Sequence, residues 1–532
     1  MLKAKAQRFV EWTLTHQAAD GMIGPASNDD WWPRMVMVKA LAQYQEATGD
    51  PRVLPVLTKY FKHQLVAMPG RPLKEWGRFR WQDEVLVIEW LHERTQDPDL
   101  LKLAALLKEQ GYDWEASFVD FKYTEPGEMH KTPLETHGVN HGQALKVAAV
   151  QYRLSGDKSE RASYYRQLGA LDKYHGLPNG MFSCDEHLAG RSPSQGTELC
   201  TVVETMFSME VALAVFGDVA IADRLEKIAF NALPGTFTDD MWAHQYDQQA
   251  NQVQVGLNSK PWRTNGPESN LYGLEPNFGC CTANFHQGWP KFAASLWMRT
   301  ADDGLVAALY SPCEVKTMVR ETLVRVVEAT EYPFRETVKL TVTPEKAVRF
   351  PLSLKVPAWA AGATVVVNGK AEGNVTAGEF VRIERTWEAG DVVELTLPMK
   401  PVATRWFNEA VAVERGPLVF SLDLQGHWVK LRERGLTADW QVFPGRQWNY
   451  GLDVSGLRVS EETVGPVPFA AANAPVKIHA TGRRVNGWKP EDGVALPVPV
   501  SPVESSEPVE ELVLIPYGAA KLRITAFPEL KG

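Results

Sequence analysis

The sequence predicts a multidomain α+β protein in which a helical half precedes a β-rich half. Up to about residue 300, apolar residues recur at spacings of three and four, as in 9–14, 35–44 and 144–152, which is the period of a helix. Beyond the segment 301–304, apolar and polar residues alternate in β-branched runs that are typical of strands. The chain has 532 residues, more than one hydrophobic core usually covers. We therefore expect three domains, at 1–300, 301–405 and 406–532.

Turns that end helices recur along the first half. Asp50, Asp97, Asp157 and Asp218 mark four of them, at separations of 47, 60 and 61 residues. A glycine precedes three of these aspartates and can supply a left-handed C-cap, while the aspartate can cap the next helix. The spacing is that of one helix hairpin with its loops, so about ten helices are predicted, arranged as an open solenoid or a closed toroid of hairpins.

The second half reads as two β-rich domains. Alternating runs at 337–342, 352–356, 363–369 and 392–397, with the hairpin signal Asn368-Gly369, predict a β-sandwich for 301–405. For 406–532 we expect strands near 411–420 and 521–527. The segments 458–475 and 497–509 are rich in Pro, Val, Glu and Ser and are predicted to be loops or surface connections.

Composition excludes several classes of function. The chain carries 56 basic and 65 acidic side chains, a net charge of -9, and nucleic acid would require a basic face. No run of 18 or more apolar residues is present, and the first residues enter a helical pattern without an apolar leader, so neither a membrane span nor a cleaved secretion signal is predicted. Five cysteines at irregular spacing argue for a reducing compartment, and we expect a cytoplasmic protein.

The cysteines nevertheless form a pattern. Cys280 and Cys281 are adjacent, and Cys200 follows Glu198 by two residues. Three thiols and a carboxylate are a plausible tetrahedral ligand set for zinc. Buried cysteines often act only as small apolar side chains, so spacing alone leaves zinc, a reactive thiol and a structural role all open.

Acidic residues precede this pattern. Asp185 and Glu186 stand in the glycine-bounded loop 180–190, 12 to 13 residues before Glu198. Two interpretations are open. A carboxyl group in an aromatic cleft can serve as a general acid, whereas a carboxyl group in a solvated loop usually has no catalytic role. The chain also has 18 tryptophans and 14 tyrosines, whose rings can stack on sugars or simply fill a core. Asp185, Glu186 and Glu198 could therefore also hydrolyse a glycoside as a carboxylate pair without a metal.

Three motifs together resemble a known family. They are Cys-Asp-Glu-His-Leu-x-Gly at 184–190, Gly-Thr-Glu-Leu-Cys at 196–200 and Gly-Cys-Cys-x-x-Asn at 279–284. The set is similar to that of glycoside hydrolase family 127, the β-L-arabinofuranosidase family, and the resemblance extends over most of the chain. It implies an (α/α)6-toroid-like helical domain followed by β-sandwich domains. Family members usually have a longer region before the first helices, so we expect the helical domain to lack an N-terminal segment or to form an incomplete toroid.

The resemblance also implies chemistry. Cys280 would be the nucleophile of a retaining hydrolase, held in a Zn²⁺ set with Glu198, Cys200 and Cys281, and Glu186 would be the acid/base. The substrate would be an oligosaccharide or glycoconjugate of plant type that loses a terminal β-L-arabinofuranosyl or related sugar. Two alternatives remain: a non-catalytic carbohydrate-binding or scaffold protein with a structural zinc site, and a metal-free carboxylate hydrolase or lyase.

Polar and aromatic residues of the loops complete the predicted site. Cys184 and Cys313 match no ligand position and are interpreted as bystanders. The resemblance makes six residues candidates for contacts with the sugar: His137, Asn140, His244, Tyr246, Trp31 and Trp32.

We also expect the protein to form a homodimer.

Overall fold

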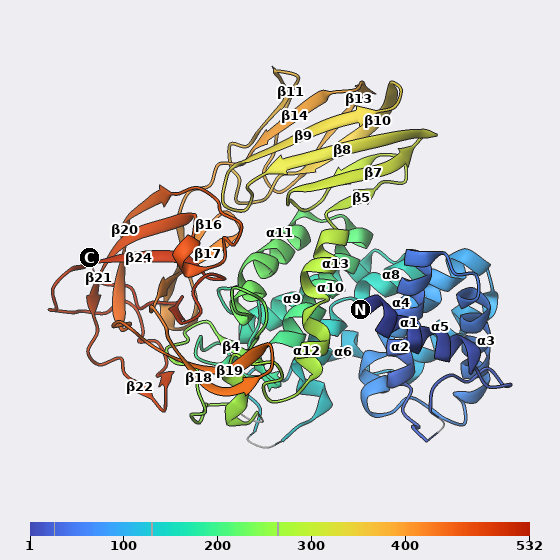
Figure 1. Cartoon of the computed structure of the whole chain (residues 1–532), viewed down its shortest axis with the longest axis horizontal. Helices are drawn as coiled ribbons and strands as arrows, with labels where there is room; N and C mark the ends of the chain where they lie inside the picture. Colours follow the sequence, from blue (N-terminus) through green and yellow to red (C-terminus); the bar gives the residue numbers. More distant parts are fainter. Residues whose placement is uncertain (26, 129–130, 263–264, 532) are drawn as a thin grey trace. The chain divides into compact units, whose positions relative to one another are not determined.

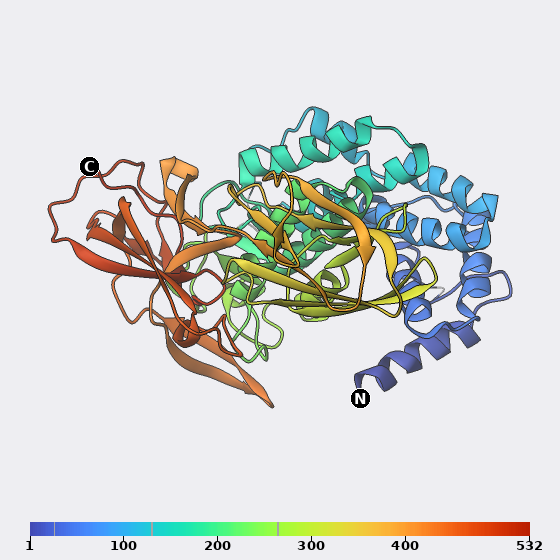
Figure 2. The same ribbon diagram turned by 90° about the horizontal axis from the view of Figure 1, so that it is seen from above.

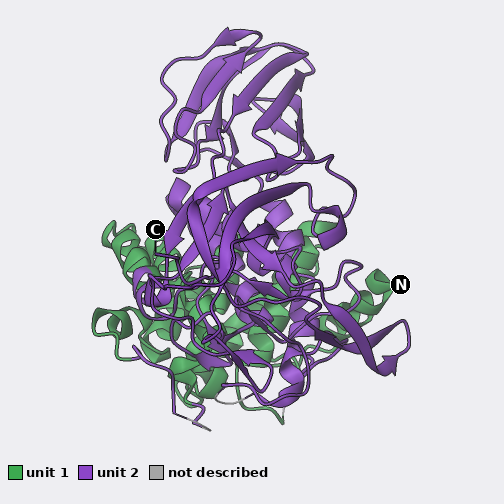
Figure 3. Ribbon diagram, turned by 90° about the vertical axis from the view of Figure 1, so that its left-hand side faces the viewer, with its two compact units in different colours: residues 1–122, 133–168 green, residues 123–132, 169–532 purple. Residues whose placement is uncertain are grey.

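The computed structural model describes residues 1–25, 27–128, 131–262 and 265–531 (Figure 1). A helical region comes first and many-stranded β-sheets follow, which confirms the predicted fold class. The chain forms two compact units, residues 1–122 with 133–168 and residues 123–132 with 169–532 (Figure 3). This division falls inside the helical half, and the predicted boundaries near 300 and 405 stay a prediction.

Unit 1 consists of helices whose ends follow the predicted turn chemistry. Gly49 and Gly156 adopt the left-handed conformation at the ends of α2 and α8, with φ of 70° and 71°, and the Asp97 side chain accepts the Asp99 backbone N–H at the start of α5. The central helix is α4, which contacts α2 and α5 and buries Asp83 with Lys146 as an ion pair. These helices run in colour from dark blue to cyan in Figure 2. They are α1 (Leu2–Thr15), α2 (Trp32–Thr48), α3 (Val53–Ala67), α4 (Glu75–Thr95), α5 (Pro98–Gln110), α6 (Trp114–Val119), α7 (Gly138–Ala144) and α8 (Val147–Ser155). Helix α9 (Ser159–His175) begins in unit 1 and ends in unit 2.

Unit 2 begins with the elements that carry the acidic and cysteine motifs. Four short strands form one sheet in the order β2-β1-β3-β4: β1 (Cys184–Asp185), β2 (His187–Leu188), β3 (Gly196–Glu198) and β4 (Asp247–Gln249). Its helices are α10 (Leu199–Phe216), α11 (Val219–Lys227), α12 (Cys280–Phe285) and α13 (Gly288–Ala294). Helix α10 is long and apolar enough to pass a composition test for a membrane span, but 72% of it is buried inside the protein, as in a core helix.

The middle β region confirms the predicted strands and their turn. One sheet has the order β13-β10-β6-β5 and a second the order β12-β11-β14-β9-β8-β7, with β9 contacting β13 between them. Asn368 and Gly369 both have positive φ, 50° and 78°, as a type I′ turn requires. The strands are β5 (Trp297–Arg299), β6 (Leu305–Ala307), β7 (Cys313–Val319), β8 (Thr322–Thr330), β9 (Thr337–Pro344), β10 (Val348–Lys355), β11 (Thr364–Val367), β12 (Lys370–Ala371), β13 (Phe380–Trp387) and β14 (Asp391–Thr396).

The last region contains one large sheet, ordered β15-β16-β17-β24-β21-β20 with β25 pairing with β17, and two hairpins, β18–β19 and β22–β23. The predicted loop 458–475 is wrong only at its start, because β20 runs to Glu461 and pairs with β21, whereas 462–475 contain no strand. The strands are β15 (Val402–Arg405), β16 (Val411–Arg415), β17 (Leu418–Asp423), β18 (His427–Arg434), β19 (Thr437–Phe443), β20 (Tyr450–Glu461), β21 (Val476–Arg484), β22 (Pro490–Glu491), β23 (Val494–Ala495), β24 (Glu510–Pro516) and β25 (Arg523–Ile524).

Side chains of this last region form hydrogen bonds with strand β4. The Tyr517 hydroxyl donates to Gln248 Oε1 at 2.7 Å, and the Arg523 guanidinium, which is fully buried, donates to the Gln249 carbonyl at 3.0 Å. A buried guanidinium is costly unless its donors are satisfied, and Arg523 also donates to the Gly235 and Ala520 carbonyls. The end of the chain therefore fixes a strand that borders the cysteine motif.

Candidate functional site

Glu198 and Cys200 occupy the junction of strand β3 and helix α10. Glu198 ends β3 in an extended conformation and is the N-cap residue of α10, so Cys200 lies in the first helical turn. The Leu199 N–H donates to the Tyr246 carbonyl at 2.9 Å, which ties the junction to the segment before β4. The N-terminal end of a helix favours negative charge, as on a thiolate.

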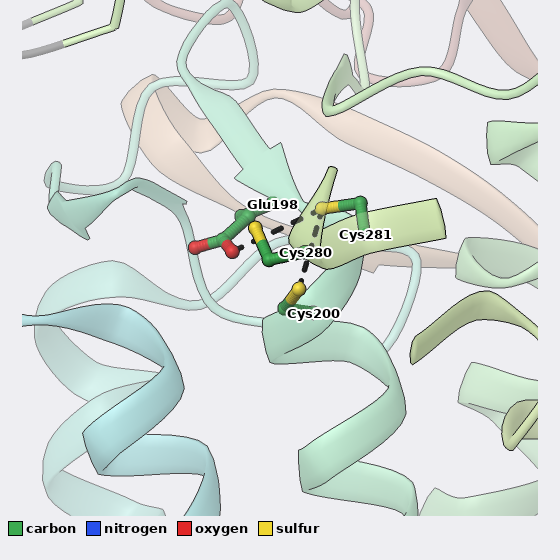
Figure 4. Close-up of side chains that lie close together, drawn as sticks. All are labelled: Glu198, Cys200, Cys280 and Cys281. Atoms are coloured by element: carbon green, nitrogen blue, oxygen red, sulfur yellow. Dashed lines mark hydrogen bonds between the residues drawn. The ribbon is translucent and has the colours of Figure 1, made fainter. Parts of the chain in front are cut away.

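Cys280 and Cys281 begin the short helix α12, which contacts α10. Figure 4 shows the four side chains converging. One potential ligand atom from each of Glu198, Cys200, Cys280 and Cys281 lies within 4.8 Å of all the others. Cys200 Sγ is 3.4 Å from Cys281 Sγ, and Cys281 Sγ is 3.9 Å from Glu198 Oε1. The arrangement could hold a metal ion.

The four groups differ in exposure and in acidity. Glu198, Cys200 and Cys281 are buried, and burial raises the pKa of each of them well above its ordinary value. Cys280 is exposed, and hydrogen bonds from the Cys200 and Cys281 thiols lower its pKa to about 3. Cys280 is therefore the thiol of the cluster that most readily becomes a thiolate.

The donor set fits a metal on two further grounds. The buried Glu198 Oε2 has no hydrogen-bond partner within the part of the chain that the structure describes, and a buried carboxyl oxygen normally has one. A divalent cation would also reverse the effect of burial, because coordination favours thiolate and carboxylate forms. Asn284, the last residue of the Gly-Cys-Cys-x-x-Asn motif, supports this set by placing its amide Nδ2 3.1 Å from Cys200 Sγ.

Glu186 lies between β1 and β2 in an unusual backbone conformation, with φ of 81°. Such a conformation is costly for a residue with a side chain and is often found at functional sites. The Tyr246 hydroxyl donates a short hydrogen bond to Glu186 Oε2, and Tyr246 itself is buried. Tyr246, predicted as a contact to the sugar, thus orients the carboxyl group predicted to be the acid/base.

His175 anchors the loop that carries Glu186. Its Nδ1 accepts the Gly190 N–H at 2.9 Å, its carbonyl accepts the Ser183 N–H at 2.8 Å, and its Nε2 donates to the Tyr123 carbonyl at 2.6 Å. Burial lowers the pKa of His175 to about 4, so the ring is neutral at pH 7. Sequence reasoning missed this residue, because nothing in its neighbourhood in the chain indicates the loop that it contacts.

Asp247 is a second residue that sequence reasoning missed. It lies in β4 opposite Glu198 of β3, and its Oδ2 accepts the Asn265 amide at 2.7 Å. Burial raises the pKa of Asp247 well above its ordinary value, and the neighbouring carboxyl of Asp185 adds to the effect. The alternation of residues 242–248 was a usable signal, since it places Asp247 on the other face of the strand from Tyr246.

His244 contacts the cysteine helix. Its Nε2 is 2.9 Å from Thr282 Oγ1, its Nδ1 is 3.0 Å from the Gln245 carbonyl, and burial lowers its pKa. Its predicted contact with the sugar stays a prediction. Cys184 and Cys313 lie outside the cluster, as predicted: Cys184 is buried, and the Cys313 thiol contacts Glu328.

The other four predicted residues belong to unit 1. Trp31 is fully buried and donates its indole N–H to the Arg71 carbonyl at 2.9 Å, which is a structural role. Trp32, His137 and Asn140 gather around two residues that the sequence did not indicate. The Arg80 guanidinium lies 4.7 Å from the centre of the Trp32 ring and donates a hydrogen bond to Asn140 Oδ1 at 2.8 Å. The His137 ring packs edge-on against the Trp76 ring, with 5.1 Å between the ring centres.

Comparison with known proteins places the chain in a family. Residues 2–294 match the model of the β-L-arabinofuranosidase GH127 catalytic domain, and residues 304–399 match that of the GH127 middle domain. No curated protein matches the chain. Among solved structures, the GH127 β-L-arabinofuranosidase Ara127N-Se from Geobacillus stearothermophilus T6 is similar, with a TM-score of 0.71 and 20% identity over 100% of this chain and 87% of that one. A protein described as a glycoside hydrolase has a TM-score of 0.70 at 17% identity, over 100% of this chain and 88% of that one. A GH127 β-arabinofuranosidase has 0.63 at 16% identity, over 99% and 85%.

Proposed function

Because the chain belongs to glycoside hydrolase family 127, as its motifs predicted, we propose that it releases a terminal β-L-arabinofuranosyl or related sugar from plant-type glycans with retention of configuration. One observation carries the proposal: an exposed thiol of low pKa, Cys280, lies in a cluster with two buried thiols and a buried carboxyl group. A structural cysteine site would have no need of an exposed member.

We propose zinc as the metal that Glu198, Cys200, Cys280 and Cys281 hold. Three sulfurs and one carboxylate oxygen suit its preference for four ligands that include thiolates. When bound, zinc would keep the thiols deprotonated at neutral pH. The side chains of the protein then perform the reaction.

In the first step the Cys280 sulfur attacks the anomeric carbon, and the bond from that carbon to the leaving oxygen breaks. Glu186 donates its proton to that oxygen, and the sugar remains linked to Cys280 as a thioglycoside. In the second step Glu186, now a carboxylate, takes a proton from water, whose oxygen attacks the same carbon and releases the Cys280 thiolate. Two displacements restore the original configuration, and the Tyr246 hydroxyl holds Glu186 in place through both.

The test is hydrolysis of aryl glycosides by the purified protein. We expect turnover of an aryl β-L-arabinofuranoside that falls by more than about a thousandfold in Cys280→Ala and in Glu186→Gln, since each substitution removes a group that reacts. Cys313→Ala is the matched control, because Cys313 is a half-buried thiol outside the cluster. Full turnover in Cys280→Ala would contradict the mechanism. Binding of glycosides without hydrolysis by the unaltered protein would instead favour the carbohydrate-binding alternative.

Metal analysis tests the zinc assignment separately. We expect one zinc per chain in the unaltered protein and in Cys313→Ala, and loss of the metal in Cys200→Ser, whose hydroxyl is a poor substitute for a thiolate ligand. A fully active protein that contains no metal would favour the metal-free carboxylate alternative.

We further propose that the protein works in the cytoplasm as a homodimer. A site made of reduced thiols suits a reducing compartment. Cell fractionation and light scattering of the purified protein would test the two statements, and a secreted or monomeric protein would contradict them.

A further inference from the structure

A separate cavity lies in unit 2 beside the hairpin β18–β19, which is orange in Figure 1. Its volume is about 700 Å³, within the range of sites that bind small molecules. The hairpin and four other parts of the chain line it: the turn 238–240, the end of β17 with 425–426, Ala471, and residues 519, 521 and 522. None of the cluster ligands and neither Glu186 nor Tyr246 is among its lining residues.

Two indole rings form an apolar corner of this cavity. The rings of Trp428 and Trp440 are 6.2 Å apart at an angle of 79°, and the ring of Tyr272 supports Trp428 at 5.1 Å. The backbone N–H of Trp440 donates to the Tyr272 carbonyl at 2.7 Å, which fixes the hairpin against the segment before the cysteine helix. The aromatic corner is therefore preformed in the protein without a ligand.

These indoles differ from the structural tryptophans of the same unit. Trp387 and Trp488 are 0% and 2% exposed, and their indole N–H groups donate to backbone carbonyls at 3.0 and 2.8 Å. Trp428 and Trp440 are only half-buried and line the cavity. Indole faces left at a concave surface are suited to stack on the flat apolar face of a sugar ring.

Polar groups of both kinds lie around the corner. Lys521 is buried, and its ammonium lies 3.7 Å from Asp239 Oδ1. Asp423 is half-buried at the end of β17, and burial raises its pKa above the ordinary value. Sugar hydroxyls both donate and accept hydrogen bonds, so carboxyl groups and an ammonium beside an aromatic face match them.

We propose that this cavity binds a sugar residue of a neutral oligosaccharide, with Trp428 and Trp440 stacking on the ring and with Asp239, Asp423 and Lys521 bonding its hydroxyls. The choice of ligand class rests on the proposed glycan substrate. The cavity adjoins the catalytic segment through the backbone, because Tyr272 pairs with Trp440 and the next residue, Gly273, pairs with His244. It would hold a part of the glycan other than the sugar that is cleaved.

Titration calorimetry on the full-length Cys280→Ala protein tests the inference without hydrolysis. The probe is an arabinan pentasaccharide, with a cellulose pentasaccharide as a second neutral glycan. In that background, Trp428→Ala and Trp440→Ala should each weaken binding by about tenfold or more, because each removes a stacking face. Trp242→Ala is the matched control, since Trp242 is 52% exposed and follows Asp240 in the same turn without lining the cavity. It should bind like the background protein.

If a tryptophan variant does not fold, Asp239→Asn replaces it in the test, because Asp239 is exposed and its substitution should not disturb folding. Asp239→Asn should weaken binding of the pentasaccharide severalfold. In the protein with Cys280 intact, Trp428→Ala should leave turnover of a small aryl glycoside unchanged. Equal affinity in the background, Trp428→Ala and Asp239→Asn proteins, or no binding of either pentasaccharide, would overturn the inference. Failure of the proposed function would be seen separately, as absence of turnover of the aryl glycoside.

Discussion

The buried ring of His175 makes the loop of Glu186 sensitive to acid. The ring is 0% exposed, accepts one hydrogen bond through Nδ1 and donates one through Nε2, so a second proton would have to displace the Gly190 N–H. Its pKa is about 4 in the folded protein against 6.5 for a free side chain. The folded pKa is depressed, so the stability contribution is complete above about pH 6.5 and is lost as the pH falls towards 4.

The difference of about 2.5 pKa units corresponds to about 3 kcal/mol at 1.36 kcal/mol per unit. We propose measuring the free energy of urea unfolding of the unaltered protein and of His175→Gln at pH 7.0, 5.5 and 4.0. Glutamine can donate to the Tyr123 carbonyl and does not titrate. The advantage of the unaltered protein over His175→Gln should therefore shrink by about 3 kcal/mol between pH 7.0 and 4.0.

His427→Gln in strand β18 is the matched control, because it removes an exposed imidazole from the same unit. It should leave the pH dependence of the unaltered protein in place. A difference between the unaltered and His175→Gln proteins that stays constant over this pH range would refute the reasoning, since it would mean that His175 is not held neutral by the fold.

Three further predictions concern Glu84, Tyr246 and Gly196. Burial raises the pKa of Glu84 to about 8, so its contribution to stability is complete below about pH 4.5 and is lost as the pH rises through 8; Glu84→Gln should therefore flatten the decline in melting temperature between pH 5 and 8, and an unchanged decline would contradict this. The Gln64 amide, whose Oε1 has no partner among the described residues, can rotate to accept from the new amide. Tyr246→Phe should lower kcat by about 10- to 100-fold with little change in melting temperature, because a hydrogen bond to a charged group contributes roughly 1.5–3 kcal/mol; wild-type kcat would show that Glu186 needs no such support. Gly196→Ala would place a methyl carbon 3.0 Å from Asp185 Cβ, so kcat should fall as the acidic loop shifts, and equal activity and melting temperature would show that the sheet yields freely.

The cluster of Glu198, Cys200, Cys280 and Cys281 could be predicted from the sequence because its geometry is mostly local. Adjacent cysteines and a Glu-x-Cys pair at the start of a helix each place two potential ligands close together, and only one contact distant in the sequence, between α10 and α12, joins the two pairs. The contact of Tyr246 with Glu186 could not be predicted, because it joins residues 60 positions apart. No local pattern encodes such a pairing.

The error in strand β20 has a different origin. Its outer half, from Ser455 to Glu461, is exposed or half-buried throughout, including its apolar residues Leu457 and Val459, so the alternation of buried and exposed residues that identifies a strand is weak there. Its register with β21 also shifts between Asp453 and Arg458, which breaks the alternation further. Pairing with the neighbouring strand, rather than local preference, makes this segment a strand.

The contacts of Arg523 and Tyr517 with strand β4 determine whether the protein can be truncated at its C-terminal end. The C-terminal sheet could be mistaken for a detachable accessory module, as carbohydrate-processing enzymes often carry. Removing it would delete the hydrogen bonds that the Tyr517 and Arg523 side chains donate to Gln248 and Gln249, and strand β4 would lose the buried environment that fixes it. Expression of residues 1–405 alone should consequently give an insoluble or inactive product, so a minimal catalyst must retain the whole C-terminal region.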